Sequence, residues 1–385
     1  MLVLNVGVVV DLSPVMEVKN ILILSQLGVC TGNILADILL GKQNPSGKLT
    51  TTWSRWDDYS KIGEFGEKHD TRYKEGIYVG YRYFDTADII PLFPFGHGLS
   101  YSEFRFTPQD CILDKTSVKV SVDINNTGEY AGKEVMQVYV SVPNGELNQP
   151  YQSLQAFHKT KTLMPGETER IQLSFDMKEI ASYDEKNERY ILEAGDYIVR
   201  VGNSSRNTMP VAIIQVDRTI TVKKVKNVLG KPDFEELRLV RNANEELCGV
   251  KKLHFDASQI QVEEINYTVS YEIDERVKNL SEEQLLMFNL GAFDRSKGVA
   301  SIIGNAGFTV AGAAGQSSLE AGQYGIKSMV MADGPAGLRI SKNYVKDKKG
   351  QVHTVDTSLP ESFLAFMPKP VLLFMKLINY KPKRG

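Results

Sequence analysis

KEGIYVGYRYFDTADIIPLFPFGHGLSYSEF, residues 74–104, is the most distinctive stretch of this 385-residue sequence, because eight Phe and Tyr rings are interleaved there with glycines. Its first part, residues 77–84, alternates with a period of two and therefore predicts a β-strand. Two prolines and the FGHG turn at residues 95–98 then predict a compact loop. So many rings around turn residues favour a packed junction where one domain ends and another begins.

The same stretch resembles a known enzyme family. YKEGIYVGYRYFD at residues 73–85, followed by PLFPFGHGLSYSEF at residues 91–104, is similar to the end of the α/β-sandwich domain of glycoside hydrolase family 3. That family contains β-glucosidases, β-xylosidases and related exo-acting enzymes, so the resemblance implies hydrolysis of terminal, non-reducing β-linked sugars. A second interpretation of the rings is a wall on which sugars stack, because aromatic faces suit the apolar faces of pyranoses.

The composition narrows the classes of partner. A formal net charge of −2 and a sequence pI near 6.3 argue against a nucleic-acid partner, which would normally meet a basic patch. The opening residues lack the basic start of a signal peptide, and no apolar run reaches the roughly 18 residues of a membrane span. We therefore expect no membrane partner, and no pattern in the sequence sets an oligomeric state.

The cysteines and histidines indicate a protein without a metal centre. Cys30, Cys111 and Cys248 are far apart and odd in number, so they form neither a disulfide framework nor a CxxC site. The five histidines are scattered and include no HExxH pattern. We expect no metal site, no cofactor and a reducing, cytoplasmic compartment.

Residues 1–108 alternate short apolar strands with a helix. Their sequence resembles the second half of the family's α/β-sandwich domain, so we expect that fold here. Residues 34–40 predict a helix, with Thr31 or Asn33 as its N-cap and Gly41 at its end. A short strand is expected before this helix, where the chain carries a continuous apolar run.

The segment GKQNPSGKLT at residues 41–50 resembles a phosphate-binding loop only superficially. Five residues separate Gly41 from Gly47, and Leu49 follows Lys48, so both the Walker spacing and the hydroxyl that binds Mg²⁺ are missing. We expect no phosphate site here.

Residues 109–218 carry short alternating strands with turns between them, which is typical of a β-sandwich. The sequence resembles the fibronectin-III-like module of the family, a packing unit without catalytic residues. Residues 190–193 and 197–202 flank Ala194-Gly195-Asp196 and predict a hairpin. Residues 219–271 are more polar and less periodic, so they predict a linker that wraps over a neighbouring domain.

Residues 272–385 resemble the beginning of the family's (β/α)8 barrel. Ser281-Glu282-Glu283-Gln284 is a capping box that predicts a helix start. The expected fold is therefore multidomain α/β plus all-β: partial α/β sandwich, fibronectin-III-like β-sandwich, then the start of a barrel. This rearranged order occurs in some bacterial members, and we expect the chain to be truncated at both ends. The tail, residues 361–385, predicts a helical loop inserted in the barrel, because two prolines argue against a membrane-surface helix.

One motif, MADGPAGLRI at residues 331–340, is expected to touch substrate. Asp333 follows a predicted barrel strand, where such enzymes place functional side chains, and its carboxylate can accept hydrogen bonds from two sugar hydroxyls. The resemblance implies that Asp333 binds hydroxyls of the terminal sugar, with Arg339 holding the carboxylate or facing the ring. The alternative is that Asp333 caps the following turn.

No residue is assigned a catalytic role. A retaining glycosidase needs a nucleophile and an acid/base, and in family 3 the nucleophile is an aspartate typically followed by tryptophan. Trp53 and Trp56 are the two tryptophans here, and neither follows an aspartate. Glu75 resembles a glutamate of the family that lies downstream of the acid/base, so it is not assigned the acid/base role. The expected partner is a β-glucoside or oligosaccharide, and a non-catalytic carbohydrate-binding or scaffold protein is the second hypothesis.

Overall fold

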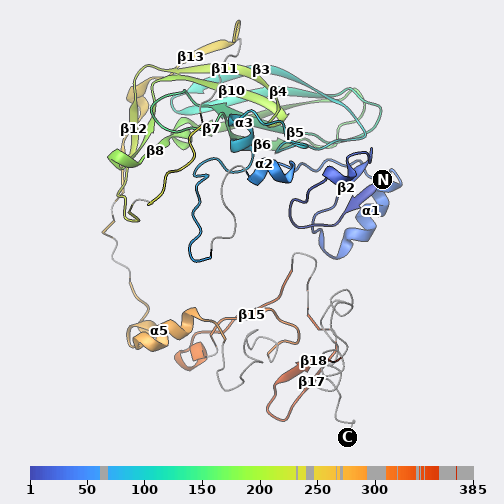
Figure 1. Ribbon diagram of the computed structural model, residues 1–385, viewed down its shortest axis with the longest axis vertical. Coiled ribbons are helices and arrows are strands. Elements are labelled where there is room, and N and C mark those ends of the chain that lie inside the picture. The colour runs from blue at the N-terminus through green and yellow to red at the C-terminus, as the bar shows by residue number, and fades with distance from the viewer. Residues whose placement is uncertain are drawn as a thin grey trace. The chain divides into compact units, whose positions relative to one another are not determined.

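The computed structural model divides the chain into two units, which are described separately (Figure 1). The first unit comprises residues 1–22 and 36–268, and the second comprises residues 23–35 and 269–385. None of the helices in the described ranges is long and apolar enough to cross a membrane. The structure describes residues 1–60, 68–230, 233–239, 247–265, 267–268, 272–292, 309–318, 320–334, 338, 340–341, 343–354 and 370.

A β-sandwich makes up most of the first unit (Figure 1). In spatial order its sheets are β13-β11-β10-β5-β6, β14-β12-β9-β8 and β3-β4-β7. The strands are β3 Phe104–Asp114, β4 Ser117–Asn126, β5 Val135–Ser141, β6 Ser153–Lys159, β7 Thr168–Asp176, β8 Ser182–Asp184, β9 Arg189–Leu192, β10 Gly195–Ser204, β11 Asn207–Val216, β12 Ile220–Lys224, β13 Lys251–His254 and β14 Glu263–Glu264.

The sandwich core follows from simple alternation along its strands. In β4 every second residue is fully buried, and β5 places its apolar side chains in the same core. Burial of one Val or Ile side chain contributes about 1.5–3 kcal/mol, so these positions hold the sheets together. β4, β5 and β7 confirm the short strands predicted within residues 109–218. The inner residues of β4 are Val118, Val120, Val122 and Ile124.

The hairpin predicted between residues 190–193 and 197–202 is wrong. β9 pairs antiparallel with β8 and β12, whereas β10 pairs with β5 and β11 in a different sheet. Gly195 has a φ of 137°, and a Cβ there would lie 2.6 Å from the Cβ of Pro143. The turn therefore carries the chain from one sheet to another in place of reversing it within one sheet.

The segment predicted as a linker contributes strands to both large sheets. β12 pairs antiparallel with β9, and β14 runs parallel to β12 at the edge. β13 adds a parallel strand beside β11, and Phe255 next to it is 1% exposed within the sandwich core. Part of residues 219–271 therefore belongs to the sandwich.

The strand predicted at residues 77–84 is also wrong. Residues 74–77 form turns, and α3 (Tyr81–Thr86) is a short helix. Gly80 has a φ of 58°, which turns the chain immediately before the helix, and its carbonyl accepts from the Phe84 amide at 3.2 Å. Residues 83–86 of α3 are all buried, which suits a packed helix and not a strand whose side chains alternate between two faces.

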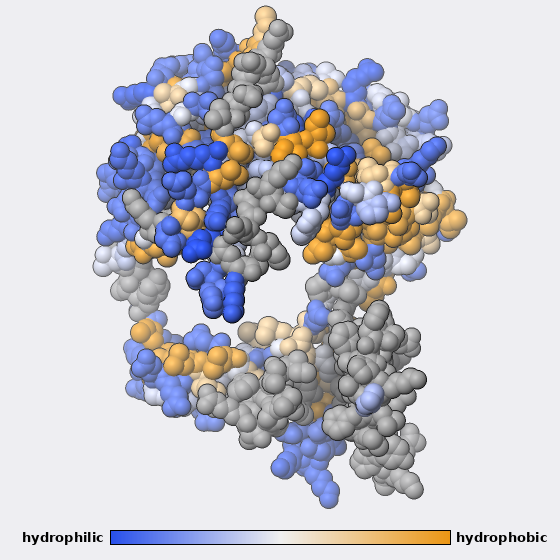
Figure 2. Space-filling view, in the orientation of Figure 1, coloured by the Kyte–Doolittle hydropathy of each residue, from blue (hydrophilic) through white to orange (hydrophobic). Residues whose placement is uncertain are grey.

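The N-terminal elements of the chain are short. β1 (Leu2–Leu4) and β2 (Ile21–Ile23) form a two-stranded sheet, α1 spans Thr31–Leu39, and α2 spans Trp56–Ser60. The predicted helix is confirmed with an earlier start, and Gly41 follows it with a φ of 70°. α1 has no buried residue, and apolar side chains gather over α1 and β2 on the visible face (Figure 2).

The second unit contains short elements. Its described residues include the helices α4 (Glu275–Lys278) and α5 (Glu282–Asn289), and the predicted capping box of α5 is present in full. The described strands form two antiparallel pairs: β15 (Gly315–Gln316) with β16 (Val330–Met331), and β17 (Tyr344–Lys346) with β18 (Val352–Thr354). The mixed α/β and all-β class is confirmed. No closed barrel is formed by the described residues, and the start of a barrel stays a prediction.

The three thiols are expected to differ sharply in reactivity. Cys111 is 2% exposed, and burial raises its pKa to about 11, so its thiolate is scarce; Cys30 and Cys248 are exposed. Ellman's reagent at about pH 8 is therefore expected to modify two thiols in the folded chain and the third only after unfolding in guanidinium. Rapid reaction of all three thiols in the native state would contradict the burial of Cys111.

Candidate functional site

Asp333, the predicted substrate-binding carboxylate, lies two residues after β16 and is half-buried. It therefore sits at the end of a strand, as expected, although this strand is two residues long and pairs antiparallel with β15. Arg339, its predicted companion, lies outside the described residues, as do Pro335 and Gly337 of the same motif. The tail at residues 361–385 also lies outside them, apart from Pro370.

A polar network within the β15–β16 pair holds the strand that precedes Asp333. The Gln316 side chain, 7% exposed, accepts from the Thr309 hydroxyl at 2.8 Å and donates to the Ser328 hydroxyl at 3.1 Å. Ser328 in turn donates to the Ser317 carbonyl at 2.9 Å. These bonds satisfy buried polar groups and fix the position at which the chain turns into the Asp333 loop.

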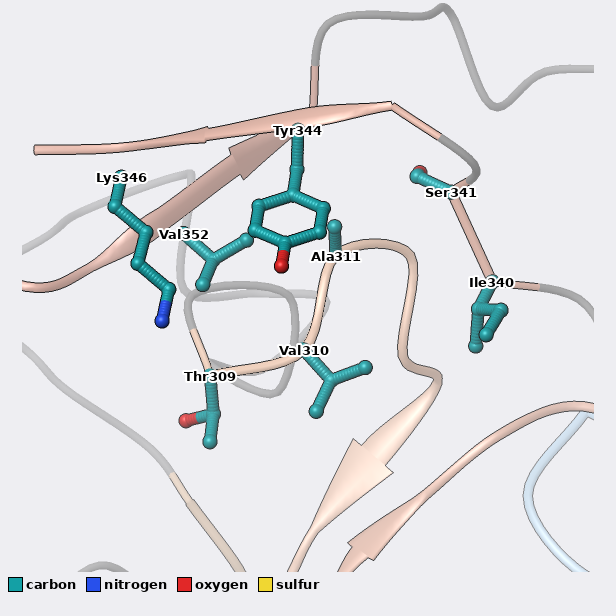
Figure 3. Close-up of a pocket in the computed structure, with 8 residues that line it drawn as sticks. All are labelled: Thr309, Val310, Ala311, Ile340, Ser341, Tyr344, Lys346 and Val352. Atoms are coloured by element: carbon teal, nitrogen blue, oxygen red, sulfur yellow. The ribbon is translucent and has the colours of Figure 1, made fainter.

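A small hollow of about 200 Å³ lies in the second unit (Figure 3). The Tyr344 ring points into it from β17, with Val352 beside the ring (Figure 3). Hydroxyls of Thr309 and Ser341 lie at its wall, and the amine of Lys346 lies at its rim. Asp333 is not among the described residues that line it. The lining offers small apolar groups, hydroxyls and one amine, and none of these eight residues carries the carboxyl group that a retaining glycosidase needs.

The described residues offer no pair of carboxyl groups that we can assign to the two steps of a retaining mechanism. Glu75 is half-buried in the turn before α3, in the first unit, and Asp333 belongs to the second. Within the described part of the chain, no three His, Cys, Asp or Glu side chains come together so that they could hold a metal ion.

The aromatic stretch of the first unit forms a packed junction. The Tyr81 and Phe95 rings stack with centroids 4.6 Å apart, and Tyr81 also meets Tyr139 of β5 edge-on at 6.0 Å. Phe84 is fully buried, and Tyr78 donates from its buried hydroxyl to the Asn148 side chain. These rings pack α3 and the following loop against the sandwich. Their burial favours the interpretation as a packed domain junction over the interpretation as a wall on which sugars stack.

A buried carboxylate lies at the centre of this junction. The Asp85 side chain, 2% exposed, pairs with the Arg206 guanidinium at 2.8 Å and accepts from the Gln152 amide at 3.0 Å. Burial raises the pKa of Asp85 above its ordinary value, although the Gln152 amide and the Arg206 charge favour its ionised form. Arg206 also donates to the carbonyls of Phe84 and Ile89 at 2.8 and 3.0 Å, and so ties the end of α3 to the β10–β11 turn.

The loop at residues 41–50 makes a second connection to the sandwich. Lys48 pairs with the buried carboxylate of Glu134 at 2.7 Å and donates to the Gly98 carbonyl at 2.8 Å. Asn44 accepts from the Ser100 hydroxyl at 2.9 Å and donates to the Ala131 carbonyl at 3.0 Å. Because Lys48 has partners inside the protein, this loop acts as a structural connector.

Sequence reasoning missed the Asp85–Arg206–Gln152 cluster. Asp85 is the last residue of the motif at 73–85 and has no signal of its own, and Arg206 lies in a polar turn without a recognisable spacing. The three residues meet only because α3 packs against the β10–β11 turn. An arginine in the turn between two long strands was the one sequence signal that could have indicated this cluster, and it is a weak signal.

Comparisons with known proteins agree with this architecture. Residues 1–101 match the glycosyl hydrolase family 3 C-terminal domain, and residues 134–205 match the fibronectin type III-like domain. Thermostable beta-glucosidase B of Acetivibrio thermocellus is 32% identical over 291 residues, which cover 74% of this chain and 38% of that enzyme. Beta-glucosidase A of Butyrivibrio fibrisolvens is 36% identical over 273 residues, covering 64% of this chain and 33% of that enzyme.

Solved structures show the same likeness. A beta-glucosidase from Paenibacillus barengoltzii aligns with a TM-score of 0.56 and 38% identity, over 58% of this chain and 27% of that one. Beta-glucosidase 3B from Thermotoga neapolitana, in complex with glucose, aligns with a TM-score of 0.53 and 42% identity, over 57% of this chain and 31% of that one. The chain thus spans 38% and 33% of the length of the two curated relatives named above. Residues 1–101 are therefore a glycoside hydrolase family 3 C-terminal domain, and the fibronectin type III-like domain follows it in the chain.

Proposed function

We propose that this chain is part of a β-glucosidase-type glycoside hydrolase that removes terminal, non-reducing β-linked sugars with retention of configuration. The observation that carries the proposal is the union of a family-3 C-terminal domain with a fibronectin type III-like domain, in a chain 32% identical to a β-glucosidase over 291 residues. The glucose complex of a relative 42% identical in sequence supports glucose as the sugar to be tested first.

Asp333 is the residue we propose for binding the terminal sugar. Its place after β16, its half-buried position and the polar network that holds the β15–β16 pair all suit a carboxylate presented to a ligand. An ionised carboxylate can accept two hydrogen bonds from adjacent hydroxyls of one ring, which orients the sugar as well as holding it. Arg339 is proposed as its companion from the sequence motif alone.

The mechanism assigns different tasks to the parts of such an enzyme. A retaining glycosidase forms a covalent glycosyl-enzyme intermediate with one carboxylate while a second carboxyl group protonates the leaving oxygen. In this chain, Asp333 contributes sugar binding and neither of those two roles. The α/β and fibronectin-like domains supply a rigid body, joined by buried contacts such as Asp85–Arg206 and Lys48–Glu134.

Substitution of Asp333 is expected to weaken sugar binding about tenfold, because the neutral amide of Asp333→Asn loses charge-assisted hydrogen bonds. Saturation-transfer NMR with methyl β-D-glucoside, titrated against the full chain, measures this directly. Glu283→Gln is the matched control, since Glu283 is exposed on α5 in the same unit. Equal binding by the wild-type and Asp333→Asn chains would remove Asp333 from the site.

A further inference from the structure

A row of side chains crosses the outer face of the four-stranded sheet. Tyr183 of β8 lies opposite Tyr190 of β9, Tyr190 lies near Lys223 of β12, and Lys223 lies opposite Glu263 of β14. Directly paired residues point to the same face of a sheet, so the four side chains share one surface. Val222, next to Lys223 in β12, belongs to the sandwich core on the other face of the sheet.

The two tyrosines of this row form an exposed aromatic pair. Their ring centroids are 5.3 Å apart with the planes tilted by 41°, and the residues are 39% and 37% exposed. A third ring, Tyr267, is 46% exposed. Partial burial, and then the charges of Glu185 and Glu188, raise the pKa of the Tyr183 hydroxyl, with smaller effects from Tyr190 and Tyr267. The Val225 amide donates to the Glu188 carbonyl at 2.9 Å and the Asn227 amide to the Glu188 carboxylate at 3.1 Å, while the Lys226 amide between them bonds to the Tyr267 hydroxyl. Glu188 and the third ring therefore contact the same short segment of the chain.

Tyr267 is held in this cluster by several contacts. Its hydroxyl accepts from the Lys226 amide at 3.1 Å, and the Lys226 amine lies 5.6 Å from the centre of its ring. The strand before it, β14, is attached by the Lys223–Glu263 pair at 3.1 Å and the Lys224–Glu264 pair at 2.7 Å. The ring thus has a defined place although it lies in a segment of irregular backbone.

We propose that Tyr183, Tyr190 and Tyr267 form a platform that binds a β-linked gluco-oligosaccharide outside the Asp333 site. Tyrosine rings pack against the apolar C–H faces of pyranoses, and their hydroxyls bond to the sugar's edge. Lys223, in the same row as the two rings, supplies a donor, and Glu188, which contacts the segment that holds Tyr267, supplies an acceptor. Such a small number of polar groups orients a ligand on an apolar surface.

Two features select this ligand among others. Lys223 and Glu263 of the row pair with each other, and the nearby Glu185 and Glu188 are acidic, so the surface favours a neutral polyol over a nucleic acid or an acidic peptide. The platform lies on an outer sheet face, which suits the extended ribbon of a β-linked glucan better than a coiled α-linked chain. The choice of a glucose polymer rests on the proposed function.

The test is native affinity electrophoresis of the full chain in gels that contain soluble mixed-linkage β-glucan, with dextran gels in parallel. We expect β-glucan to retard the wild-type chain and dextran to leave it unretarded. The Tyr183→Ala/Tyr190→Ala double variant is expected to bind about tenfold more weakly, because stacking rings are typical hot spots. Tyr190→Phe, which keeps the ring, is expected to retain most of the retardation.

Phe157→Ala is the matched control, because Phe157 is 67% exposed on β6 of the other large sheet. A cross-strand ring pair can also stabilise a sheet, so circular dichroism must show that each variant is folded. If the double variant unfolds, the test uses Tyr267→Ala, which lies outside the strands and is also expected to weaken the retardation by β-glucan. Absence of retardation of the wild-type chain, equal retardation by dextran, or an equal loss in Phe157→Ala would overturn the platform.

Failure of the platform is distinguishable from failure of the proposed function. Asp333→Asn is expected to leave β-glucan retardation unchanged, and the tyrosine variants are expected to leave binding of methyl β-D-glucoside unchanged. Loss of both kinds of binding in the tyrosine variants would place the monosaccharide at the platform and contradict two separate sites.

Discussion

The purified 385-residue chain is expected to release nitrophenol from p-nitrophenyl β-D-glucoside no faster than buffer does. A retaining enzyme needs two carboxyl groups about 5–5.5 Å apart, one to attack and one to protonate the leaving oxygen. The sequence contains no aspartate followed by tryptophan, and neither Glu75 nor Asp333 is assigned to either role. Sugar binding is the role proposed for Asp333, but binding that is equal in the ground and transition states does not raise kcat.

The assay is a continuous absorbance measurement at high concentration of the chain, with a complete family-3 β-glucosidase as the positive control. Glu75→Gln and Asp333→Asn chains are measured beside the wild type. Turnover by the wild-type chain that disappears in one of these variants would show that this residue is a catalytic carboxylate. Turnover that survives in both would show that the reacting groups lie elsewhere in the chain.

Truncation of Arg206 is expected to lower the free energy of unfolding of the first unit by about 3 kcal/mol, near the lower end for a broken buried pair. The Asp85 carboxylate is 2% exposed at the side chain, and Arg206→Ala leaves it without its cationic partner. Two carbonyls, those of Phe84 and Ile89, lose a donor as well. The expected loss of unfolding free energy is near the lower end of the range because the Arg206 side chain itself is 29% exposed.

Arg170→Ala is the matched control for this measurement. Arg170 makes a two-point contact with Asp123 at 2.6 and 2.8 Å, but its side chain is 63% exposed. Exposed pairs of this kind contribute about 0–1 kcal/mol. Urea unfolding followed by circular dichroism gives both values. Equal losses in the two variants would mean that burial of Asp85 has no special role in joining α3 to the sandwich.

Several elements were determined by the sequence through purely local physics. β4 alternates valine and isoleucine with polar residues, so a period of two that matches a half-buried strand specifies both the element and its inner face. The capping box at Ser281 and Gln284 specifies the start of α5 because both of its hydrogen bonds lie within four residues. The glycine after α1 ends that helix for an equally local reason.

The tertiary structure decided the remaining features, because they depend on partners far away in the chain. Residues 77–84 have a strand-like period, yet packing of Tyr78 and Phe84 into the junction makes them a turn and a helix. Gln152 lies 67 residues from Asp85 and Arg206 lies 117 residues from Ile89, so no local pattern predicts the cluster that they form. The tyrosine row arises in the same way, since strand pairing across a sheet, and not spacing along the chain, brings Tyr183, Tyr190 and Lys223 to one face.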